Sequence, residues 1–287
     1  MTGNVDAART IAFQGEPGAY SDLACRAAYP EMTTLPCVSF EHAFAAVEEG
    51  RAAIAMIPIE NSVAGRVADI HQLLPETGLH IVGEHFQRVQ HQLLAPRGAD
   101  LASVKRVYSH VQALSQCRRS LRALGLQPMT YPDTAGAAAY VARRGDQAEA
   151  AIASSLAGDI YDLDVLKPDI EDEKHNTTRM IVLSREPRIP DPKSGRLITT
   201  FVFRVRNVPA ALYKAMGGFA TNGVNMTKLE SYMVGGDFNA TQFYADVDGH
   251  PDHPNVRLAL EELDFFSREV RILGVYPAHP FRRRESD

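Results

Sequence analysis

The chain has 287 residues, of which 45% are hydrophobic and 23% charged, and its formal net charge is −5 at pH 7. These values predict a folded protein of about two domains and exclude disordered, collagen-like and disulfide-scaffold chains. The acidic balance argues against a nucleic-acid partner, which usually selects a basic face. No apolar run approaches the roughly 18 to 20 residues of a membrane span, and the first residues lack a signal-peptide pattern. We therefore expect a cytoplasmic protein with no membrane partner.

Strand-like and helix-like segments alternate through the first 184 residues. We expect strands at 10–14, 53–59, 79–82, 92–94, 104–108, 129–131, 150–153 and 180–183. We expect helices at 22–28 behind a Ser21 cap, at 40–49 behind a Ser39 cap, and at 112–124 and 134–143. This alternation predicts an α/β fold with a largely parallel sheet, which binds ligands at the carboxyl ends of its strands.

A proline-rich stretch at 185–196 predicts a linker, because Pro187, Pro190 and Pro192 each lack a backbone donor. The segment that follows has a different order of expected strands and helices. It predicts strands at 197–205, 224–233, 238–247 and 270–275 and helices at 210–221 and 254–266, with a hairpin turn at 235–237. The order β-α-β-β-α-β is typical of a ferredoxin-like domain.

Three cysteines, Cys25, Cys37 and Cys117, are an odd number in a long chain, which favours reduced thiols. The ten histidines show neither HExxH nor CxxC spacing. The sequence therefore gives no support to a metal site, and we expect none.

Polar clusters follow or precede several of the expected strands. They are GEPGAYS at 15–21, IENS at 59–62, SHVQ at 109–112, DTA at 133–135 and NTTR at 176–179. Glycines before a helix N-terminus suit an anion, and an arginine such as Arg179 can bind a carboxylate through its guanidinium fork. Taken singly, however, each cluster is more typical of a turn, a helix cap or a surface side chain than of a ligand site.

In the order GEPGAYS, IPIENSVAG, SHVQALSQC, DTAGAAA, AAIAS and NTTRM, these segments resemble the prephenate dehydratase family. The segment PAALYKAMGGFATNGVNMTKLESYM resembles the family's C-terminal ACT regulatory domain. The resemblance implies a two-lobed catalytic domain over 1–184, similar to periplasmic binding proteins of the second class, a linker over 185–196 and an ACT domain over 197–287. It also implies a reaction, in which prephenate loses carbon dioxide and water to form phenylpyruvate without a metal or an organic cofactor.

The resemblance also assigns residues. The family's Thr-Arg-Phe motif reads Thr178, Arg179 and Met180 here, so Thr178 would assist the leaving hydroxyl and Arg179 would pair with a carboxylate. We expect Arg179 to hold the pyruvyl carboxylate, because a firm grip on the departing carboxylate would stabilise the ground state. The residues implied to orient the substrate are Asn61, Ser62, Ser109, Gln116 and Thr134, with backbone donors near Ala19 and Tyr20. Val111 replaces the family's usual proline, and neither this change nor Met180 removes a catalytic group.

In the regulatory part, the resemblance implies a phenylalanine site that forms between chains, and hence a homodimer or tetramer. The residues implied are Ala210, Ala211, Leu212, Asn222, Gly223, Asn225, Leu229, Glu230 and Ser231. Ala210 stands where the family has glycine, and Tyr232 and Met233 replace its Arg-Pro, so we expect feedback inhibition with altered affinity or amino-acid preference. From the pattern alone, a small domain packed for stability is favoured. The Asn222–Asn225 turn speaks against it, because Gly223 permits a close backbone approach to a ligand.

Two alternatives stay open at this point. Arogenate dehydratase performs the same elimination on the transaminated substrate, and the sequence does not decide between the two. A non-catalytic amino-acid sensor or solute-binding protein could use the same two-lobed fold, because fold alone does not determine function. The intact Thr178 and Arg179 argue against the sensor.

Overall fold

The computed structural model describes residues 6–206, 208–233 and 240–285. The chain forms two compact units, one from residues up to Val67 together with His85–Met180, the other from Ala68–Glu84 together with Ile181 onward. Residues 68–84 therefore belong to the second unit although they lie early in the sequence. The domain boundaries drawn from the sequence at 184 and 197 stay a prediction.

The first lobe of the first unit contains a parallel sheet of β1, β2 and β3 covered by helices, and β4 pairs antiparallel with β3. β1 lies between β2 and β3, and α1 and α2 pack against β1. β1 is buried along almost its whole length, as expected for a parallel strand that is covered on both faces. The elements are η1 (Ala7–Arg9), β1 (Thr10–Gln14), α1 (Tyr20–Ala28), β2 (Thr33–Cys37), α2 (Phe40–Glu48), β3 (Ile54–Asn61) and β4 (Gly65–Arg66).

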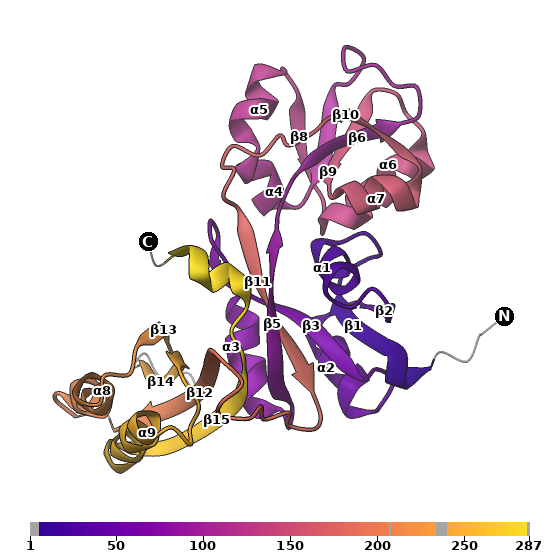
Figure 1. Cartoon of the computed structure of the whole chain (residues 1–287). Helices are drawn as coiled ribbons and strands as arrows, with labels where there is room; N and C mark the ends of the chain where they lie inside the picture. The colour runs from indigo at the N-terminus through magenta and orange to yellow at the C-terminus, as the bar shows by residue number, and fades with distance from the viewer. Residues whose placement is uncertain (1–5, 207, 234–239, 286–287) are drawn as a thin grey trace. The chain divides into compact units, whose positions relative to one another are not determined.

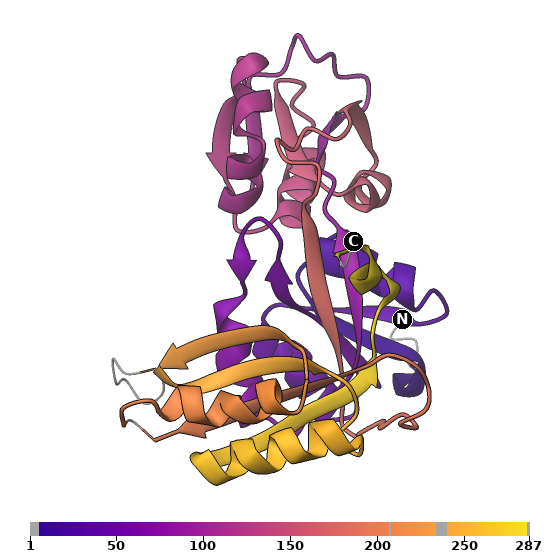
Figure 2. The same cartoon turned by 60° about the vertical axis from the view of Figure 1, so that its left-hand side comes forward.

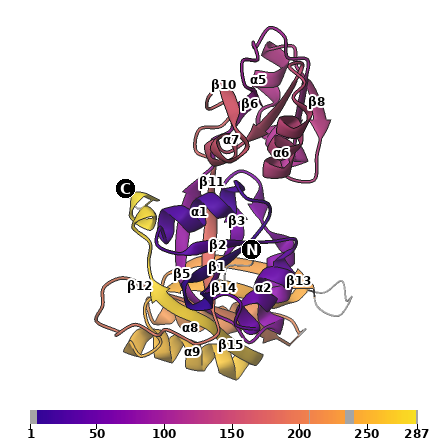
Figure 3. The same cartoon turned by 90° about the vertical axis from the view of Figure 1, so that its right-hand side faces the viewer.

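The second lobe is a mixed sheet in the order β10-β6-β9-β7-β8. Figure 3 shows this lobe with the helices α5, α6 and α7 around its strands. Neighbouring residues of one strand point to opposite faces, so Leu93 packs with α4 and α5 while Leu94 packs with α6 and α7. The strands are β6 (Gln92–Pro96), β7 (Arg106–Ser109), β8 (Gln127–Thr130), β9 (Glu149–Ala153) and β10 (Leu163–Lys167). The helices are α4 (Val111–Gln116), α5 (Arg118–Ala123), α6 (Thr134–Arg144) and α7 (Ser155–Tyr161).

The chain passes between these two lobes twice, first from β5 (His80–Arg88) into β6, and then from β10 back into β11 (Thr177–Ser184) (Figure 1). Two α/β lobes are the arrangement that the sequence resemblance predicts, and the two extended crossovers are seen only in the structure. The α/β fold class is therefore confirmed.

A loop of the first lobe docks on a helix of the second. The Ser154 hydroxyl donates to the Gly18 carbonyl oxygen over 2.5 Å, and the Tyr161 hydroxyl donates to the Pro17 carbonyl oxygen over 2.9 Å. Gly18 has a φ of +89°, and a Cβ atom there would lie 2.8 Å from the Cα of Ala157. Glycine is required at this contact because both the backbone conformation and the close approach exclude a side chain.

The second unit contains a four-stranded antiparallel sheet in the order β13-β14-β12-β15. Together with two helices, this is the predicted ferredoxin-like β-α-β-β-α-β order, which is confirmed. Both helices lie on one face of the sheet (Figure 2), over a core that includes Phe201, Phe203 and Phe219. The elements are β12 (Leu197–Val205), α8 (Ala211–Thr221), β13 (Met226–Met233), β14 (Ala240–Asp248), α9 (Pro254–Phe266) and β15 (Ser267–Pro277). The predicted hairpin turn at 235–237 lies outside the described residues.

Residues from early in the sequence extend this sheet. β15 is parallel to β5 at the pair Gly274 and Ile81, where a Cβ atom on residue 274 would lie 2.1 Å from the Ile81 carbonyl oxygen. Arg282 binds both carboxylate oxygens of Glu84, at 2.7 and 2.9 Å. The short elements here are α3 (Ala68–Leu73), η2 (Leu74–Glu76) and η3 (Pro280–Glu285).

Several sequence expectations need correction. Ser21 is not a cap, because α1 begins at Tyr20 and Ala19 takes the N-cap position. The helix expected at 112–124 is two helices that meet at Cys117. The NTTR segment lies largely inside β11 and not before it. The short elements β2, α3, α7 and β10 are not predicted by the sequence pattern.

No helix in the described ranges combines the length and apolar character that a membrane crossing requires. Cys25, Cys37 and Cys117 are free and buried. The predicted state of the three thiols is thus confirmed.

We expect Gly18→Ala to lower the free energy of unfolding by about 2–4 kcal/mol, because backbone strain and overpacking against Ala157 add together. Gly98→Ala is the matched control, since its φ is +74° and its Cβ would meet nothing within 4 Å. The control should cost only about 1–2 kcal/mol. Urea unfolding of both variants measures the difference, and equal losses would show that the contact with Ala157 is unimportant.

Candidate active site

The ends of β3 and β11 meet in the first unit and bring predicted site residues together. The Ser62 backbone N–H donates to the Thr177 carbonyl oxygen over 2.9 Å, and the Ser62 hydroxyl accepts from the Thr177 N–H over 3.0 Å. This register places Asn61 beside Thr178, with Asn61 Nδ2 donating to Thr178 Oγ1 over 2.9 Å. Thr178 is only 9% exposed. The pairing thus presents one threonine hydroxyl, held by an amide, where β3 ends and β11 begins.

Asn61 is itself held by the backbone that follows it. Its Oδ1 accepts from the N–H groups of Val63 and Ala64, at 3.0 and 2.8 Å. Such an Asx turn fixes which end of the amide is oxygen. Asn61 Nδ2 therefore faces the site, where it also donates to Asn176 Oδ1 over 2.7 Å.

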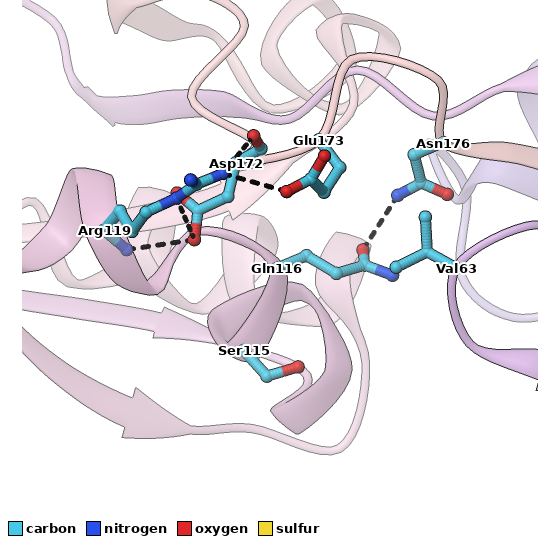
Figure 4. Close-up of a pocket in the computed structure, with 7 residues that line it drawn as sticks. All are labelled: Val63, Ser115, Gln116, Arg119, Asp172, Glu173 and Asn176. Atoms are coloured by element: carbon cyan, nitrogen blue, oxygen red, sulfur yellow. Dashed lines mark hydrogen bonds and ion pairs between the residues drawn. The ribbon is translucent and has the colours of Figure 1, made fainter.

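The hydrogen bonds continue into the second lobe. Asn176 Nδ2 donates to Gln116 Oε1 over 3.0 Å, and His91 Nε2 lies 2.9 Å from the same oxygen (Figure 4 shows Asn176 and Gln116). His91 Nδ1 lies 2.8 Å from the Tyr20 hydroxyl. We call Asn61, Asn176, Gln116 and His91 the site chain; it connects Thr178 at one end with Tyr20 at the other.

The sequence analysis missed two members of the site chain. Asn176 lies within the NTTR motif and could have been found there, since a buried asparagine beside a strand end needs partners. His91 lies between two strands, and no motif marks it. In the structure Asn176 is 1% exposed and His91 2% exposed.

His91 is buried, and its backbone lies beside the Glu171 carboxylate. The Glu171 carboxylate accepts from the His91 backbone N–H over 2.8 Å. Burial lowers the pKa of His91, against the opposing effects of the Gln116 hydrogen bond and the Glu171 charge. Burial also raises the pKa of Tyr20 well above its ordinary value. Both groups are therefore neutral near pH 7.

Arg179 follows Thr178 in β11 and is 4% exposed. Its Nη1 donates to Glu60 Oε1 over 2.9 Å, and the Glu60 side chain is 31% exposed. The guanidinium is thus already paired within the protein. A substrate carboxylate can reach it only beside Glu60 or in its place.

A pocket of about 230 Å³ opens next to the site chain (Figure 4). The Gln116 amide nitrogen is turned toward Val63 within this lining. Arg119 donates to the Asp172 carbonyl oxygen over 2.6 Å and to Glu173 Oε1 over 2.9 Å. The lining residues are Val63, Ser115, Gln116, Arg119, Asp172, Glu173 and Asn176.

Other residues predicted from the sequence lie apart from the site chain. The Ser109 hydroxyl is fully buried and donates to the Ile152 carbonyl oxygen over 2.6 Å, so it ends β7 and does not cap a helix. Thr134 begins α6 behind the Asp133 cap. The Ala19 N–H donates to the Glu16 carbonyl oxygen over 3.0 Å. Among the described residues, no group of three or more His, Cys, Asp or Glu side chains is arranged to hold a metal ion.

The residues implied for an effector site lie in the second unit in two groups. Ala210 precedes α8 and Asn222 ends it, and a helix of 11 residues separates its ends by about 16 Å. Asn222 Nδ2 donates to the Gly218 carbonyl oxygen over 2.8 Å, and Asn225 Nδ2 donates to Asp248 Oδ2 over 2.9 Å. Leu229 is 38% exposed on β13, which is the edge strand of its sheet. One chain therefore does not gather all of these residues around one small ligand.

Comparison with known proteins identifies relatives over nearly the whole chain. The sequence model described as prephenate dehydratase matches residues 11–188. A Komagataeibacter europaeus protein named as a bifunctional N-acyl-homoserine lactone acylase/prephenate dehydratase is 56% identical, over 96% of this chain and 98% of its own length. Arogenate dehydratase/prephenate dehydratase 2 of Arabidopsis thaliana is 39% identical, over 93% of this chain and 72% of its own length. The structure of an Arthrobacter aurescens prephenate dehydratase in complex with L-Phe is 31% identical, with a TM-score of 0.86 over 94% of this chain and 90% of that one.

The lowered pKa of His91 predicts how stability depends on pH. Above an ordinary histidine pKa of about 6.5, His91 is neutral in both the folded and the unfolded state and contributes no dependence. As the pH falls through this value, the unfolded state binds a proton first, so the free energy of unfolding falls by at most ~1.4 kcal/mol per pH unit. Urea unfolding should show a shallower slope for His91→Gln below pH 6.5 than for the wild type. Parallel curves would contradict the assignment.

Ala210 has a φ of +61°, a left-handed conformation that costs a non-glycine residue about 1 kcal/mol. We expect Ala210→Gly to raise the free energy of unfolding by about this amount. Ala211→Gly, one residue later inside α8, is the control and should lower it by about 0.5–1 kcal/mol. Thermal and urea unfolding distinguish the two, and destabilisation by Ala210→Gly would show that the Ala210 methyl group makes a needed contact.

Proposed function

The chain belongs to the prephenate dehydratase family and is a carbon–oxygen lyase, and we propose that it converts prephenate to phenylpyruvate with Thr178 at the leaving hydroxyl. The observation that carries the proposal is the Asn61–Thr178 hydrogen bond. Thr178 Oγ1 is the acceptor in it, and the Thr178 hydroxyl has no other hydrogen-bond partner within the described residues. Its hydrogen is therefore left to donate to a bound substrate.

The chemistry needs such a donor. The bond from the ring to its carboxylate breaks and releases carbon dioxide, and the freed electron pair completes the aromatic ring as hydroxide leaves the opposite carbon. The hydroxide takes up a proton and departs as water. Because threonine is a very weak acid, Thr178 acts by a hydrogen bond that strengthens as negative charge grows on the leaving oxygen. Help of this kind contributes about 10²- to 10⁴-fold.

Binding of the dianionic substrate requires a cation, and we propose that Arg179, the residue after Thr178 in β11, supplies it. We propose that the pyruvyl carboxylate joins or displaces Glu60 on the guanidinium. We propose the Gln116 amide nitrogen, which is turned toward Val63 in the pocket lining, as a second donor to the substrate (Figure 4). Ser62, Ser109, Thr134, Ala19 and Tyr20 remain predicted contacts, and of these Tyr20 joins the site chain.

Arogenate is the alternative substrate, because the Arabidopsis relative is named for both activities. The two substrates differ only in a side-chain amine or keto group, so the same Thr178 chemistry serves both. The sensor alternative is no longer favoured, since the family is one of lyases.

We propose that the ferredoxin-like domain is an ACT domain that binds phenylalanine and inhibits the reaction. The Arthrobacter aurescens relative, whose structure holds L-Phe, supports this. The two separated groups of effector residues support a site shared between two chains, and thus a homodimer or tetramer. We place the enzyme in the cytoplasm, where its three free thiols stay reduced.

A second activity, hydrolysis of N-acyl-homoserine lactones, is suggested by the Komagataeibacter europaeus relative at 56% identity. It is a separate proposal, because amide hydrolysis needs an attacking water or nucleophile and the dehydration needs neither. Liberated homoserine lactone, measured beside phenylpyruvate, tests it on the same protein.

Purified protein should form phenylpyruvate from prephenate without added metal, and added phenylalanine should lower the rate. Thr178→Val should lower kcat by about 10²- to 10⁴-fold. Thr178→Ser keeps the hydroxyl and should lie within about tenfold of the wild type. Arogenate, with phenylalanine formation as the readout, is run in parallel. Failure of the folded protein to turn over either substrate would contradict the proposal.

For Arg179, the conservative change to lysine keeps the charge and removes the bidentate fork. If Arg179 holds the pyruvyl carboxylate, Arg179→Lys should raise KM by about tenfold or more while kcat changes little. Steady-state kinetics separates the two constants. A selective loss of kcat would instead place Arg179 at the reacting groups.

A further inference from the structure

The hydrogen bonds of the site chain have only one possible direction, and the backbone sets it. The N–H groups of Val63 and Ala64 both point at Asn61 Oδ1. A backbone N–H can only donate, so this atom is oxygen and Asn61 Nδ2 must donate. Its two hydrogens are used by Asn176 Oδ1 and Thr178 Oγ1.

The next two amides follow from the first. Asn176 Oδ1 accepts from Asn61, so the other end of Asn176 is the NH₂ group, which donates to Gln116 Oε1 over 3.0 Å. Gln116 Oε1 is therefore an oxygen that accepts. Reversing either amide would place two donors or two acceptors against each other in a buried position, which costs about 1–3 kcal/mol.

His91 completes the series. Its Nε2 lies 2.9 Å from Gln116 Oε1, an acceptor, so Nε2 must carry a hydrogen. In the neutral imidazole Nδ1 then has a lone pair, which accepts from the Tyr20 hydroxyl over 2.8 Å. Tyr20 is placed for this by α1, and it shares its one hydroxyl hydrogen between His91 Nδ1 and the Gln90 carbonyl oxygen, to which it also donates over 2.9 Å. The hydrogen bonds from Asn61 through Gln116 to His91 thus follow one pattern of donors and acceptors, to which residues of both lobes contribute.

We propose that His91 and Asn176 are positioning residues for the dehydration: the backbone sets the direction of the Asn61 amide, and Asn176, Gln116 and His91 hold that amide in place against Thr178, so that the Thr178 hydrogen is directed to the substrate. This rests on the proposed function of Thr178. Neither residue touches the reacting atoms. Their effect passes through three amides, each of which polarises the next in a site shielded from water.

The first test determines which ring nitrogen of His91 carries the proton, and it needs no substrate. Long-range ¹H–¹⁵N correlation spectra of protein labelled at histidine assign which ring nitrogen of His91 is protonated, with His91→Gln identifying the signal. The inference predicts the neutral Nε2–H form near pH 7. The Nδ1–H form would reverse the chain and overturn it.

The second test is a double-mutant cycle with prephenate in single-turnover experiments. His91→Leu removes the donor at similar volume and should lower the rate about tenfold, the effect of losing one hydrogen bond. His91→Gln keeps an N–H near the Nε2 position and should recover the rate to within about threefold, with KM little changed in both. In a Thr178→Val background, His91→Leu should change the rate less than about twofold, because the hydroxyl that the chain positions is absent. A full tenfold loss in that background would overturn the inference.

Controls separate positioning from packing. Cys117→Ala creates a small defect beside Gln116 and removes none of the hydrogen bonds of the site chain, because Cys117 is a fully buried residue of the hydrophobic core. It should keep the rate to within about threefold. Asn176→Ala is the second variant and keeps the test available if His91→Leu does not fold, as judged by circular dichroism. It should lower the rate by about 10- to 100-fold, again only while Thr178 is present.

These experiments distinguish a failure of the proposed function from a failure of the positioning role of His91 and Asn176. If the wild type turns over neither prephenate nor arogenate, the proposed function fails whatever the tautomer of His91. If the wild type is active but His91 carries its proton on Nδ1, or the cycle is additive, the positioning role alone fails.

Discussion

Two backbone N–H groups, those of Val63 and Ala64, fix the direction of the hydrogen bonds in the site because they occupy the oxygen of Asn61. Once this amide is oriented, the geometry leaves no freedom to Asn176, Gln116 or the tautomer of His91. The consequence is local and chemical: Thr178 receives a hydrogen bond and keeps its own hydrogen for a ligand. A short turn after a buried strand thus prepares a weak acid for its reaction.

The fold serves this arrangement by bringing distant segments together. The first lobe supplies Asn61 and Tyr20, the second supplies Gln116, and the crossovers supply His91 and Asn176. The contact between Gly18 and the start of α7 holds the two lobes in register, and it tolerates no side chain at residue 18. The backbone at Gly18 therefore determines how the two lobes pack, and the backbone at Val63 and Ala64 determines the direction of the hydrogen bonds in the site.

Local signals in the sequence were sufficient for much of this structure. The caps Ser39 and Asp133 and the ferredoxin-like order are found where the sequence predicts them, because caps and hydrophobic periods act over a few residues. The break at Cys117 was not predictable, since α5 is capped by the carboxylate of Asp172, which accepts from the Arg119 N–H over 3.0 Å from more than fifty residues away. His91 could not be predicted either, because its partners come from three other segments of the chain and no local sequence pattern indicates them.

The central claim is that Asn61 donates to Thr178 and that this direction matters for the chemistry. Asn61→Asp tests it most directly, because the carboxylate keeps the shape and the bonds from Val63 and Ala64 but turns the group facing Thr178 into an acceptor. We would measure the single-turnover rate with saturating prephenate, after confirming the fold by circular dichroism. The account predicts a loss of about 100-fold or more, as Thr178 gives its hydrogen to the carboxylate and no longer to the leaving hydroxyl. A rate within about threefold of the wild type would contradict it.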